Sequence, residues 1–479
     1  MIALLENVAI YETESKEYPQ TPFNPPKNFP EYPFKGELQT DNEVYTAIRN
    51  IFNLLGMDSR HYGSAVWNPL GELIKSGDNV VIKPNLLYHY HPEGRLDAII
   101  VHGSILRAVI DYVFIALKKK GKITVAESPV WQADFKKILD LSGISEMAEY
   151  LRGRGVEIGI VDMRETMFSK SYDSFKLPEV VKLEGDPTGY QTVDLGEGSE
   201  FHGLVFDLNN YRNSMTDKIK NENVCTYRMP KTILSADVII NLSKLKTHVM
   251  AGNTLSLKNI VGTYGEKIDL PHYRTGTEIC DEHPRFSGTK ALKQTTVKKL
   301  YKFFKKYPFL EKMRPVKNFV LKVTDERWKE PFPLWGCWYG NDTVWRMTLD
   351  LNKILLYASK EGKMEKTRQR KVFAIIDGII SGEDRGPIRP KERNDGIIIA
   401  GNDFVATDLV ATRLMGFDHY KIPILRKSLE SKGYSLTNVK VEEIKCNSNK
   451  DKWKKLWELK KEDLLNFEPP LSWRGHIEL

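Results

Sequence analysis

The chain has 479 residues, of which 41% are hydrophobic and 28% are charged, and this composition excludes a wholly disordered chain. The length predicts two domains, or one large domain with insertions. The formal net charge is +8, but residues 289–330 alone hold 11 Lys and 2 Arg against 4 acidic residues, so the remainder is close to neutral and predicts no nucleic-acid partner.

Neither a membrane span nor a secretory signal is predicted. No apolar run reaches the ~18 residues that cross a bilayer, and the opening MIALLENVAIYETE lacks the basic and cleavage regions of a signal peptide. The cysteines are scattered without a CxxC pair, which predicts reduced thiols and neither a zinc site nor an iron–sulfur cluster; they are Cys225, Cys280, Cys337 and Cys446. We therefore expect a cytoplasmic protein.

Residues 1–75 are predicted to form an N-terminal arm and lead-in. Prolines and aromatic residues crowd positions 15–40, and so many prolines exclude a regular helix or a central strand. We expect an extended arm packed across the body, because the interleaved Phe and Tyr side chains favour burial. A recognition motif for a proline-binding partner is the weaker alternative.

Strands and helices alternate from residue 76 onward. Short β-branched runs predict buried strands, and apolar residues at helical spacing predict helices. The predicted strands are 79–83, 123–126, 156–161, 237–242, 372–376 and 396–400, and the predicted helices are 103–120, 133–152, 343–360 and 404–416. This order predicts an α/β fold with a mostly parallel sheet and helices on both faces.

The α/β core is predicted in two parts, residues 76–275 and 336–430. Between them lies a basic insertion at 276–335, and a charged tail follows at 431–479. Trp473 and His476 suggest that this tail packs back onto the body. Within the insertion, residues 297–306 predict a basic amphipathic helix, for which a weak contact with an anionic membrane surface is one expectation. A docked helix with a solvated lysine face is the favoured alternative.

Residues 241–262 hold the strongest candidate site, because they follow a predicted buried strand directly. In an open parallel sheet, ligands bind just beyond the carboxyl ends of the strands. This stretch carries residues that suit a phosphate or carboxylate: Lys244, Lys246, His248, Asn253, Ser256, Lys258 and Asn259. Gly252 and Gly262 allow a close backbone approach. A solvated loop, with the leucine inward and the lysines outward, is an alternative of about equal weight.

A second candidate site follows the first predicted strand. Lys83 and Asn85 come at its end, and His102 to Ser104 begin the next helix, where backbone N–H groups can hold an anion. His89 and His91 lie between them. The HxH pair lacks further ligands at a telling spacing, so we interpret these two as surface histidines.

Acidic residues form the third candidate site. Asp377 and Glu383 are predicted on one strand-end loop, where carboxylates suit Mg²⁺ or another divalent cation. Helix capping is the competing role for acidic residues, and we favour it for Asp403 but not for Asp377 or Glu383.

Two further helix starts have candidate caps. Asn402 or Asp403 is a natural N-cap for the helix at 404, and Asp342 or Thr343 could cap the helix that begins near 343. Aromatic residues flank the second of these caps, so a pocket wall is an alternative there.

Several stretches together resemble a known family. They are VVIKPNLL at 80–87, the helix start at His102, TVAESP at 124–129, DVIINLSKLKTHVMAGNTLSLKNIVG at 237–262, AIIDGIISGEDRGP at 374–387 and GIIIAGNDFVATDLVATRLMG at 396–416. In this order they resemble the family called domain of unknown function 362. By position, the resemblance marks Lys83, Asn85, Lys244, Lys246, His248, Lys258, Asn259, Asp377, Glu383, Asp403 and Asp408.

The resemblance also shows a departure. Many members carry a ferredoxin-type iron–sulfur module, whereas this chain has no closely spaced cysteine run, which removes electron transfer through clusters as a hint. The chain is similar to a longer subgroup through residues 335–346 and the tail NFEPPLSWRGHIEL. That likeness implies, as an expectation, a place in surface-polysaccharide or related biosynthesis.

These residues predict an enzyme, transferase- or ligase-like, that acts on an anionic phosphorylated or carboxylated metabolite. Lys244, Lys246 and Lys258 would hold the anion, and His248 would transfer a proton together with Lys246 as the catalytic pair. No GxGxxG, Walker A or nucleophile motif is present. Two alternatives stay open: a non-catalytic ligand-binding or assembly protein, and a redox protein with a cofactor that the sequence does not reveal.

Overall fold

The computed structural model describes residues 6–34, 36, 38–168, 180–204, 208–209, 225–267, 270–274, 336–431 and 433–479. The basic insertion predicted at 276–335, including the amphipathic segment 297–306, lies outside the described residues, as does Cys280. In the described part of the chain, no helix has both the length and the apolar character needed to cross a membrane.

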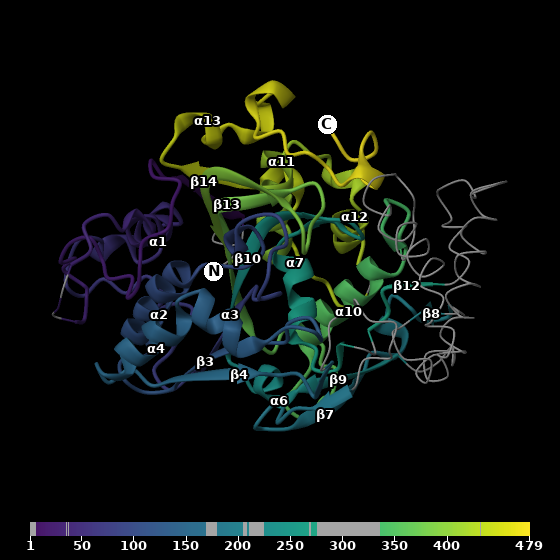
Figure 1. The fold of residues 1–479 in the computed structure, drawn as a ribbon, viewed down its shortest axis with the longest axis horizontal. Coiled ribbons are helices and arrows are strands. Elements are labelled where there is room, and N and C mark those ends of the chain that lie inside the picture. Colours follow the sequence, from purple (N-terminus) through teal and green to yellow (C-terminus); the bar gives the residue numbers. More distant parts are fainter. Residues whose placement is uncertain are drawn as a thin grey trace, which may run out of the picture.

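A central sheet of nine strands organises the fold (Figure 1). From one edge to the other its strands are β15 (Lys445–Ser448), β1 (Asn7–Glu12), β14 (Lys391–Gly401), β13 (Lys371–Glu383), β10 (Val238–His248), β2 (Asn79–Pro84), β3 (Lys122–Glu127) and β4 (Ile158–Asp162), and β11 (Gly252–Thr254) pairs with β10. The strands from β13 to β4 run parallel, whereas β14 is antiparallel to both β13 and β1. The predicted mostly parallel sheet is confirmed.

Helices cover both faces of this sheet, as Figure 1 shows. One face carries α1 (Glu43–Leu54), α2 (Gly103–Leu117), α3 (Phe135–Leu141) and α4 (Ile144–Arg152), and the other carries α7 (Ser256–Asn259), α10 (Val344–Tyr357), α11 (Phe404–Leu414) and α12 (Pro423–Leu429). Successive strand residues point to opposite faces: Val80 and Ile82 pack on the α2 side, and Val81 packs on the α10 side. This alternation explains why the strands are apolar throughout.

The single helix expected over residues 133–152 is wrong. The chain forms two helices there, because Gly143 adopts a φ of 72°, a left-handed conformation that interrupts the helical path and begins α4. Adding a Cβ at Gly143 would place it 2.7 Å from the ring of Phe23. Both the backbone conformation and the close contact therefore require glycine at this position.

The described residues between positions 13 and 42 form neither helix nor strand, and their aromatic side chains pack on the face that carries α2. Phe23 and Phe29 are buried in the core of that face. The fully buried Arg107 of α2 donates hydrogen bonds to the Pro22 carbonyl (2.7 Å) and to the Tyr32 hydroxyl (2.9 Å). Within the predicted lead-in 1–75, strand β1 joins the central sheet, a role that its short sequence did not reveal.

Smaller elements surround the main sheet. They are the strand pairs β5 (Thr166–Phe168) with β6 (Val180–Lys182), β7 (Tyr190–Asp194) with β9 (Thr226–Pro230), and β8 (Leu208–Asn209) with β12 (Tyr273–Arg274), and the helices α6 (Lys231–Leu234) and α13 (Asp451–Lys454). The strands before and after residues 276–335 belong to the same sheet, because β13 pairs directly with β10.

The C-terminal tail packs back onto the body, as predicted. Trp473 is fully buried, and its Nε1 donates to the Val249 carbonyl at 2.7 Å. The His476 ring stacks on Tyr339 with the ring centres 3.6 Å apart. In addition, β15 of the tail forms an edge strand that pairs with β1 near the start of the chain.

The N-cap of α11 provides a first test of stability. Asp403 occupies this position, and its Oδ1 accepts from the Ala406 N–H at 3.0 Å, whereas Asn402 makes no capping contact. Asp403→Ala is expected to lower the free energy of unfolding by about 1–2 kcal/mol. The matched control Asn402→Ala should change it by less than about 0.5 kcal/mol. Urea denaturation of both variants measures the difference, and equal losses would contradict the assignment of the cap.

Candidate functional site

Strand β10 continues six residues past its predicted end and brings the lysine-rich motif inside the protein. Lys244, Lys246 and His248 share one face of the strand because side chains alternate with a period of two. Lys244 and Lys246 are 0% exposed, and His248 is 7% exposed. The alternative of a solvated loop with outward lysines is therefore wrong. Burial follows from the neighbours, since Lys244 pairs with Asp377 on β13 and Lys246 with Thr254 on β11.

Lys244 has its charge matched within the chain. Its Nζ lies 2.9 Å from Asp377 Oδ2 and 2.8 Å from the Tyr18 hydroxyl, and that hydroxyl donates to Asp377 Oδ1 at 2.6 Å. The Tyr18 ring stacks on His102 at 4.1 Å, so the N-terminal arm covers this end of the sheet. Burial lowers the pKa of Lys244, and the Asp377 carboxylate opposes this effect.

Lys83 is also matched, by a carboxylate that sequence reasoning did not single out. Its Nζ donates to Glu127 Oε2 (2.8 Å), Asn259 Oδ1 (3.1 Å) and the Pro84 carbonyl (2.8 Å), which uses all three of its hydrogens. Burial lowers its pKa, and Glu127 opposes the shift. Lys83 therefore positions Asn259 and Glu127 and has no hydrogen left for a ligand.

Gly262 lets the chain pass close to this ion pair. A Cβ at position 262 would lie 2.2 Å from Glu127 Oε1 and 2.5 Å from Lys83 Nζ. Both groups are buried and locked by other contacts, so they cannot move away. The predicted close backbone approach at this glycine is thus explained by the buried pair beside it.

Lys246 has no carboxylate partner in the described part of the chain. Its Nζ donates to Asn85 Oδ1 at 2.9 Å and to the Ile99 carbonyl. Asn85 is oriented for this contact because its own amide nitrogen donates to Asn259 Oδ1 at 3.0 Å. Burial, and then the nearby cations Lys244 and Lys258, hold the pKa of Lys246 well below its ordinary value.

Further basic groups lie near Lys246 or near one another, and we call the set Lys246, His248, Lys258, Lys267 and His272 the cation cluster. Burial lowers the pKa of Lys258 to about 8, with Lys83 adding to the shift, and lowers that of Lys267 to about 7. The Lys267 Nζ donates to the Val261 carbonyl, whereas the Lys258 Nζ has no acceptor among the described residues. Burial also lowers the pKa of His272 to about 4, and Lys258 contributes.

The hydrogen bonds of the two histidines define their protonation. His248 Nδ1 accepts from the Met250 N–H at 3.0 Å, and burial holds its pKa well below the ordinary value, so the neutral ring carries its proton on Nε2. His272 Nδ1 faces the Leu270 carbonyl at 2.9 Å, which places its proton on Nδ1. In the neutral state His248 is therefore a donor at Nε2, and His272 Nε2 carries a lone pair.

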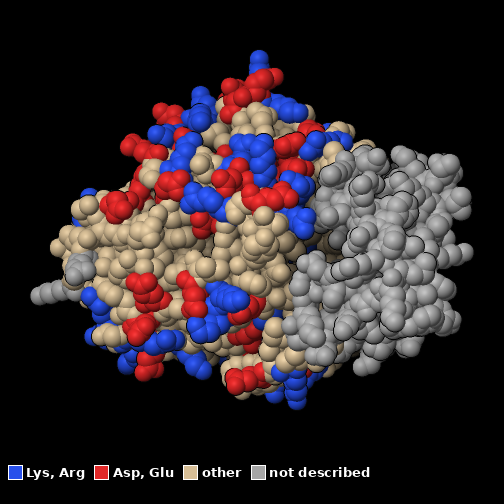
Figure 2. Space-filling model, viewed as in Figure 1, with Lys and Arg blue, Asp and Glu red and all other residues tan. Residues whose placement is uncertain are grey.

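The surplus of positive charge is internal. Glu127 is the one carboxylate in the described residues that raises the pKa of a member of the cation cluster, and it is already paired with Lys83. Figure 2, in contrast, shows Lys and Arg mixed with Asp and Glu over the visible surface of the described residues. On this visible face, therefore, neither sign of charge forms a separate patch.

The two residues expected to bind a divalent cation each face basic partners. Asp377 pairs with Lys244, and Glu383 contacts Arg393 at 2.9 Å and Lys391 at 3.3 Å. Both lie on β13 and not on a loop. Among the described residues, no group of three or more His, Cys, Asp or Glu is arranged to hold a metal ion. The cation at Asp377 and Glu383 stays a prediction.

A family model described as Domain of unknown function (DUF362) matches residues 80–182 and 188–413. The chain belongs to this family. No curated protein and no solved structure gives a match. The matched region of the DUF362 domain contains the whole cation cluster and both buried ion-pair lysines, whereas Tyr18 lies outside it.

Four contributors to the DUF362 site were missed by sequence reasoning. Glu127 stands in the family stretch TVAESP at the end of β3, so its place at a strand end was an available signal. Lys267 and His272 follow the motif by a few residues in an irregular segment, and Tyr18 lies in the proline-rich arm. No local pattern connects these three to the sheet, because tertiary packing alone brings them there.

Other residues of the DUF362 motif make hydrogen bonds to the backbone around the site. Asp408 accepts from the Ser256 N–H (2.7 Å) and the Leu257 N–H (2.8 Å) at the start of α7. Ser256 in turn accepts from Asn241 Nδ2 through its carbonyl at 2.8 Å. These contacts fix the short helix that carries Lys258 and Asn259. Ser256 contributes its backbone N–H and carbonyl to this support, and the ligand contact of its side chain stays a prediction.

Two smaller expectations of the sequence are settled by contacts. His89 Nδ1 accepts from the Asp134 N–H, and His91 Nε2 faces the Pro390 carbonyl, so neither is arranged with the other as a metal ligand. Thr343, one of the two expected residues, occupies the N-cap position of α10, but its side chain makes no capping hydrogen bond. Instead, Asn341 Oδ1 accepts from the N–H groups of Thr343 and Val344, both at 3.0 Å.

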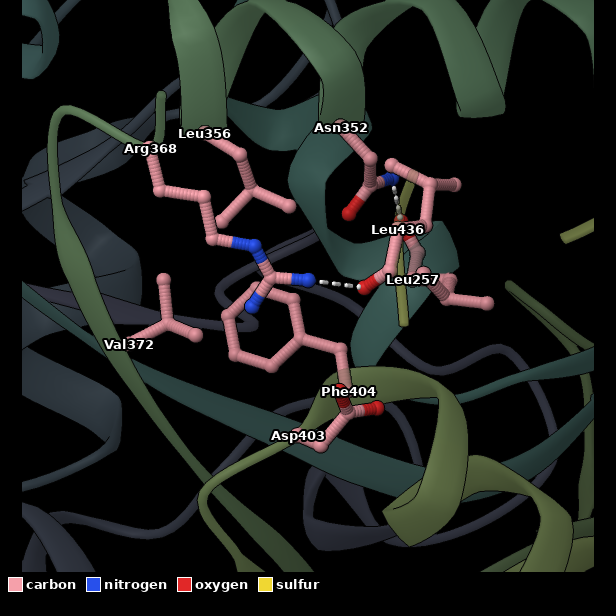
Figure 3. Close-up of a pocket in the computed structure, with 8 residues that line it drawn as sticks. All are labelled: Leu257, Asn352, Leu356, Arg368, Val372, Asp403, Phe404 and Leu436. Carbon is pink, nitrogen blue, oxygen red and sulfur yellow. Dashed lines mark hydrogen bonds between the residues drawn. The ribbon is translucent and has the colours of Figure 1, made fainter. Parts of the chain in front are cut away.

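A small gap between α7, α10 and α11 does not provide an alternative site. Figure 3 shows the side chains around it, with Asn352 donating to the Leu257 carbonyl (3.0 Å) and Arg368 to the Leu436 carbonyl (2.8 Å). The space between them is too narrow for a water molecule. The strand-end cluster therefore remains the candidate functional site of the DUF362 domain.

Proposed function

We propose that the chain is an enzyme that binds an anionic metabolite, phosphorylated or carboxylated, at the cation cluster. The observation that carries the proposal is the lack of a matching charge: within the described residues Lys258 has no hydrogen-bond acceptor, and Lys267 contacts only the neutral carbonyl oxygen of Val261. Lys267 is buried and Lys258 is half-buried. Basic groups that are removed from water without counter-charges cost stability, and an anion that binds among them relieves that cost. The transferase- or ligase-like chemistry expected from the sequence remains part of this proposal.

The hydrogen-bond donors that remain unused indicate a role for each residue. Lys258 and Lys267 would hold the anionic group, because each has hydrogens that no acceptor in the described residues takes up. His248 would donate from Nε2 to an oxygen of the same ligand. Lys83 and Lys244 would position neighbouring side chains and would not contact the anion, because Glu127 and Asp377 already match their charges.

Replacing Lys258 with methionine tests the anion site. The stem keeps its length while the charge is lost, and a charge-assisted hydrogen bond is worth about 1.5–3 kcal/mol, so affinity for sulfate or phosphate should fall about 10- to 100-fold. Isothermal titration calorimetry measures the change. The matched control is Lys136→Met, whose side chain is 83% exposed on α3, and it should bind like the unmodified protein.

Two results would contradict the proposal. One is the absence of saturable sulfate or phosphate binding by the unmodified protein, and the other is equal affinity of Lys258→Met and Lys136→Met. Catalysis needs a separate readout. Metabolites that co-purify with or bind to the protein are compared by mass spectrometry before and after incubation, and an unchanged mass for every bound anion favours the non-catalytic binding protein instead.

A further inference from the structure

Lys246 differs from the other buried lysines of the sheet. Lys83 and Lys244 each touch a carboxylate, at 2.8 and 2.9 Å, and this contact favours the charged form of each lysine. Lys246 is equally buried, but its two described contacts are the neutral oxygens of Asn85 and Ile99. A buried amine that meets only neutral acceptors is stable without its extra proton.

The contacts of Lys246 also orient its nitrogen. A neutral amine has two hydrogens and one lone pair, and the two hydrogens are taken up by Asn85 Oδ1 and the Ile99 carbonyl. The lone pair then occupies a remaining tetrahedral direction. Asn85 cannot turn away easily, because Asn259 holds its amide nitrogen and Lys83 holds Asn259.

We propose that Lys246 is a covalent catalyst that forms an imine with an aldehyde or ketone carrying a phosphate or carboxylate group. The inference rests on the anion site proposed above, because Lys258 and Lys267 would bind the charged group of the same molecule. Desolvation and neighbouring cations are the usual means by which proteins turn a lysine into a nucleophile. Lys246 has both, since Lys244 and Lys258 lower its pKa further after burial.

The step is balanced without any further reactant. The nitrogen lone pair attacks the carbonyl carbon and forms a carbon–nitrogen bond, which gives a carbinolamine. The former carbonyl oxygen then leaves as water, and the two hydrogens that it carries away balance the two that the amine loses. His248 lies close enough to Lys246 for the lysine to lower the pKa of the imidazole, and its Nε2–H is a suitable proton donor to the departing oxygen.

Reductive trapping on the full chain tests the imine. The protein is incubated at pH 7 with glyoxylate, a small aldehyde that carries a carboxylate, together with cyanoborohydride, and is then digested for peptide mass spectrometry. The Lys246 peptide should gain a carboxymethyl group at least tenfold faster than the peptide with Lys136, because an exposed lysine is almost entirely protonated at this pH. Added sulfate should slow the labelling of Lys246 and leave Lys136 unaffected.

The outcomes separate this inference from the proposed function. Sulfate binding without preferential labelling of Lys246 overturns the imine and leaves the anion site intact, and so does faster labelling of Lys258 or Lys267. If Lys246 is labelled preferentially but sulfate neither binds nor slows the labelling, the reactive amine is supported and the anion site is refuted. As a second measurement, Lys246→Met should remove the label from its peptide while sulfate affinity changes less than in Lys258→Met.

Discussion

Asp377→Asn is expected to lower the free energy of unfolding by about 3–5 kcal/mol, because it leaves the buried Lys244 without its counter-charge. The side chains of Lys244 and Asp377 are both 0% exposed, so water cannot compensate the lost carboxylate. The substitution also weakens the hydrogen bond from the Tyr18 hydroxyl, which is 2.6 Å from Asp377 Oδ1. Chemical denaturation at neutral pH measures the loss.

A double-mutant cycle isolates the ion pair from the rest of the loss. Lys244→Met combined with Asp377→Asn removes both charges, and it should be more stable than Asp377→Asn alone. The control pair is Lys136→Met with Asp140→Asn on α3, an exposed i,i+4 pair whose loss should change stability far less than the loss of the buried pair. A loss below 1 kcal/mol for Asp377→Asn, or no recovery in the double variant, would show that this pair contributes little.

The pH dependence of Asp377→Asn gives an independent signature. Burial lowers the pKa of Lys244, and the variant lacks the carboxylate that opposes this shift. The folded variant then binds fewer protons than its unfolded chain, and stability rises with pH wherever the unfolded chain binds more protons. The variant should therefore recover part of its loss as the pH rises toward the ordinary lysine value, and the recovery should be absent when Lys244 is also replaced.

Local sequence patterns were sufficient for the order of the elements and for the motif that lines the strand ends. Buried strands such as β2 and β3 are short apolar runs, and the helices between them have a clear apolar periodicity. The pattern of each segment and the order of the segments therefore predict the same elements there. Asp403 was predicted as a cap because capping depends on a few adjacent residues. Predictions succeeded where the interactions that decide a structure are close together in the chain.

The same patterns did not predict the parts of the central strands that carry polar residues. After Leu242, β10 places a basic residue at every second position, with Ser243, Leu245 and Thr247 between them, and such an alternation is typical of a half-solvated surface. Its burial depends on β11, β13 and the arm residue Tyr18, which lies 226 positions from Lys244. Similarly, β13 and β14 extend well beyond their apolar runs because they pair with each other. Polar residues in a central strand break the local rule, and such places are expected at functional sites.

Anion affinity is expected to fall steeply between pH 6 and pH 9. The free protein holds Lys267 with a pKa of about 7 and Lys258 with a pKa of about 8, both lowered mainly by burial. An anion binds the protonated lysines and raises their pKa values, so binding takes up protons as the pH rises. Above its pKa in the free protein, each lysine that contacts the anion should reduce affinity about tenfold per pH unit.

Sulfate is the suitable probe for this pH dependence, because its charge is constant over the range whereas that of phosphate is not. Calorimetric titrations at several pH values should show the decline beginning near pH 7 and becoming steeper above pH 8. Lys258→Met should retain the first part of the decline, which belongs to Lys267, and lose the second. The matched variant Lys136→Met should reproduce the full curve. A sulfate affinity that does not change from pH 6 to pH 9 would mean that neither lysine contacts the anion, and the charge at the site would then have to come from elsewhere.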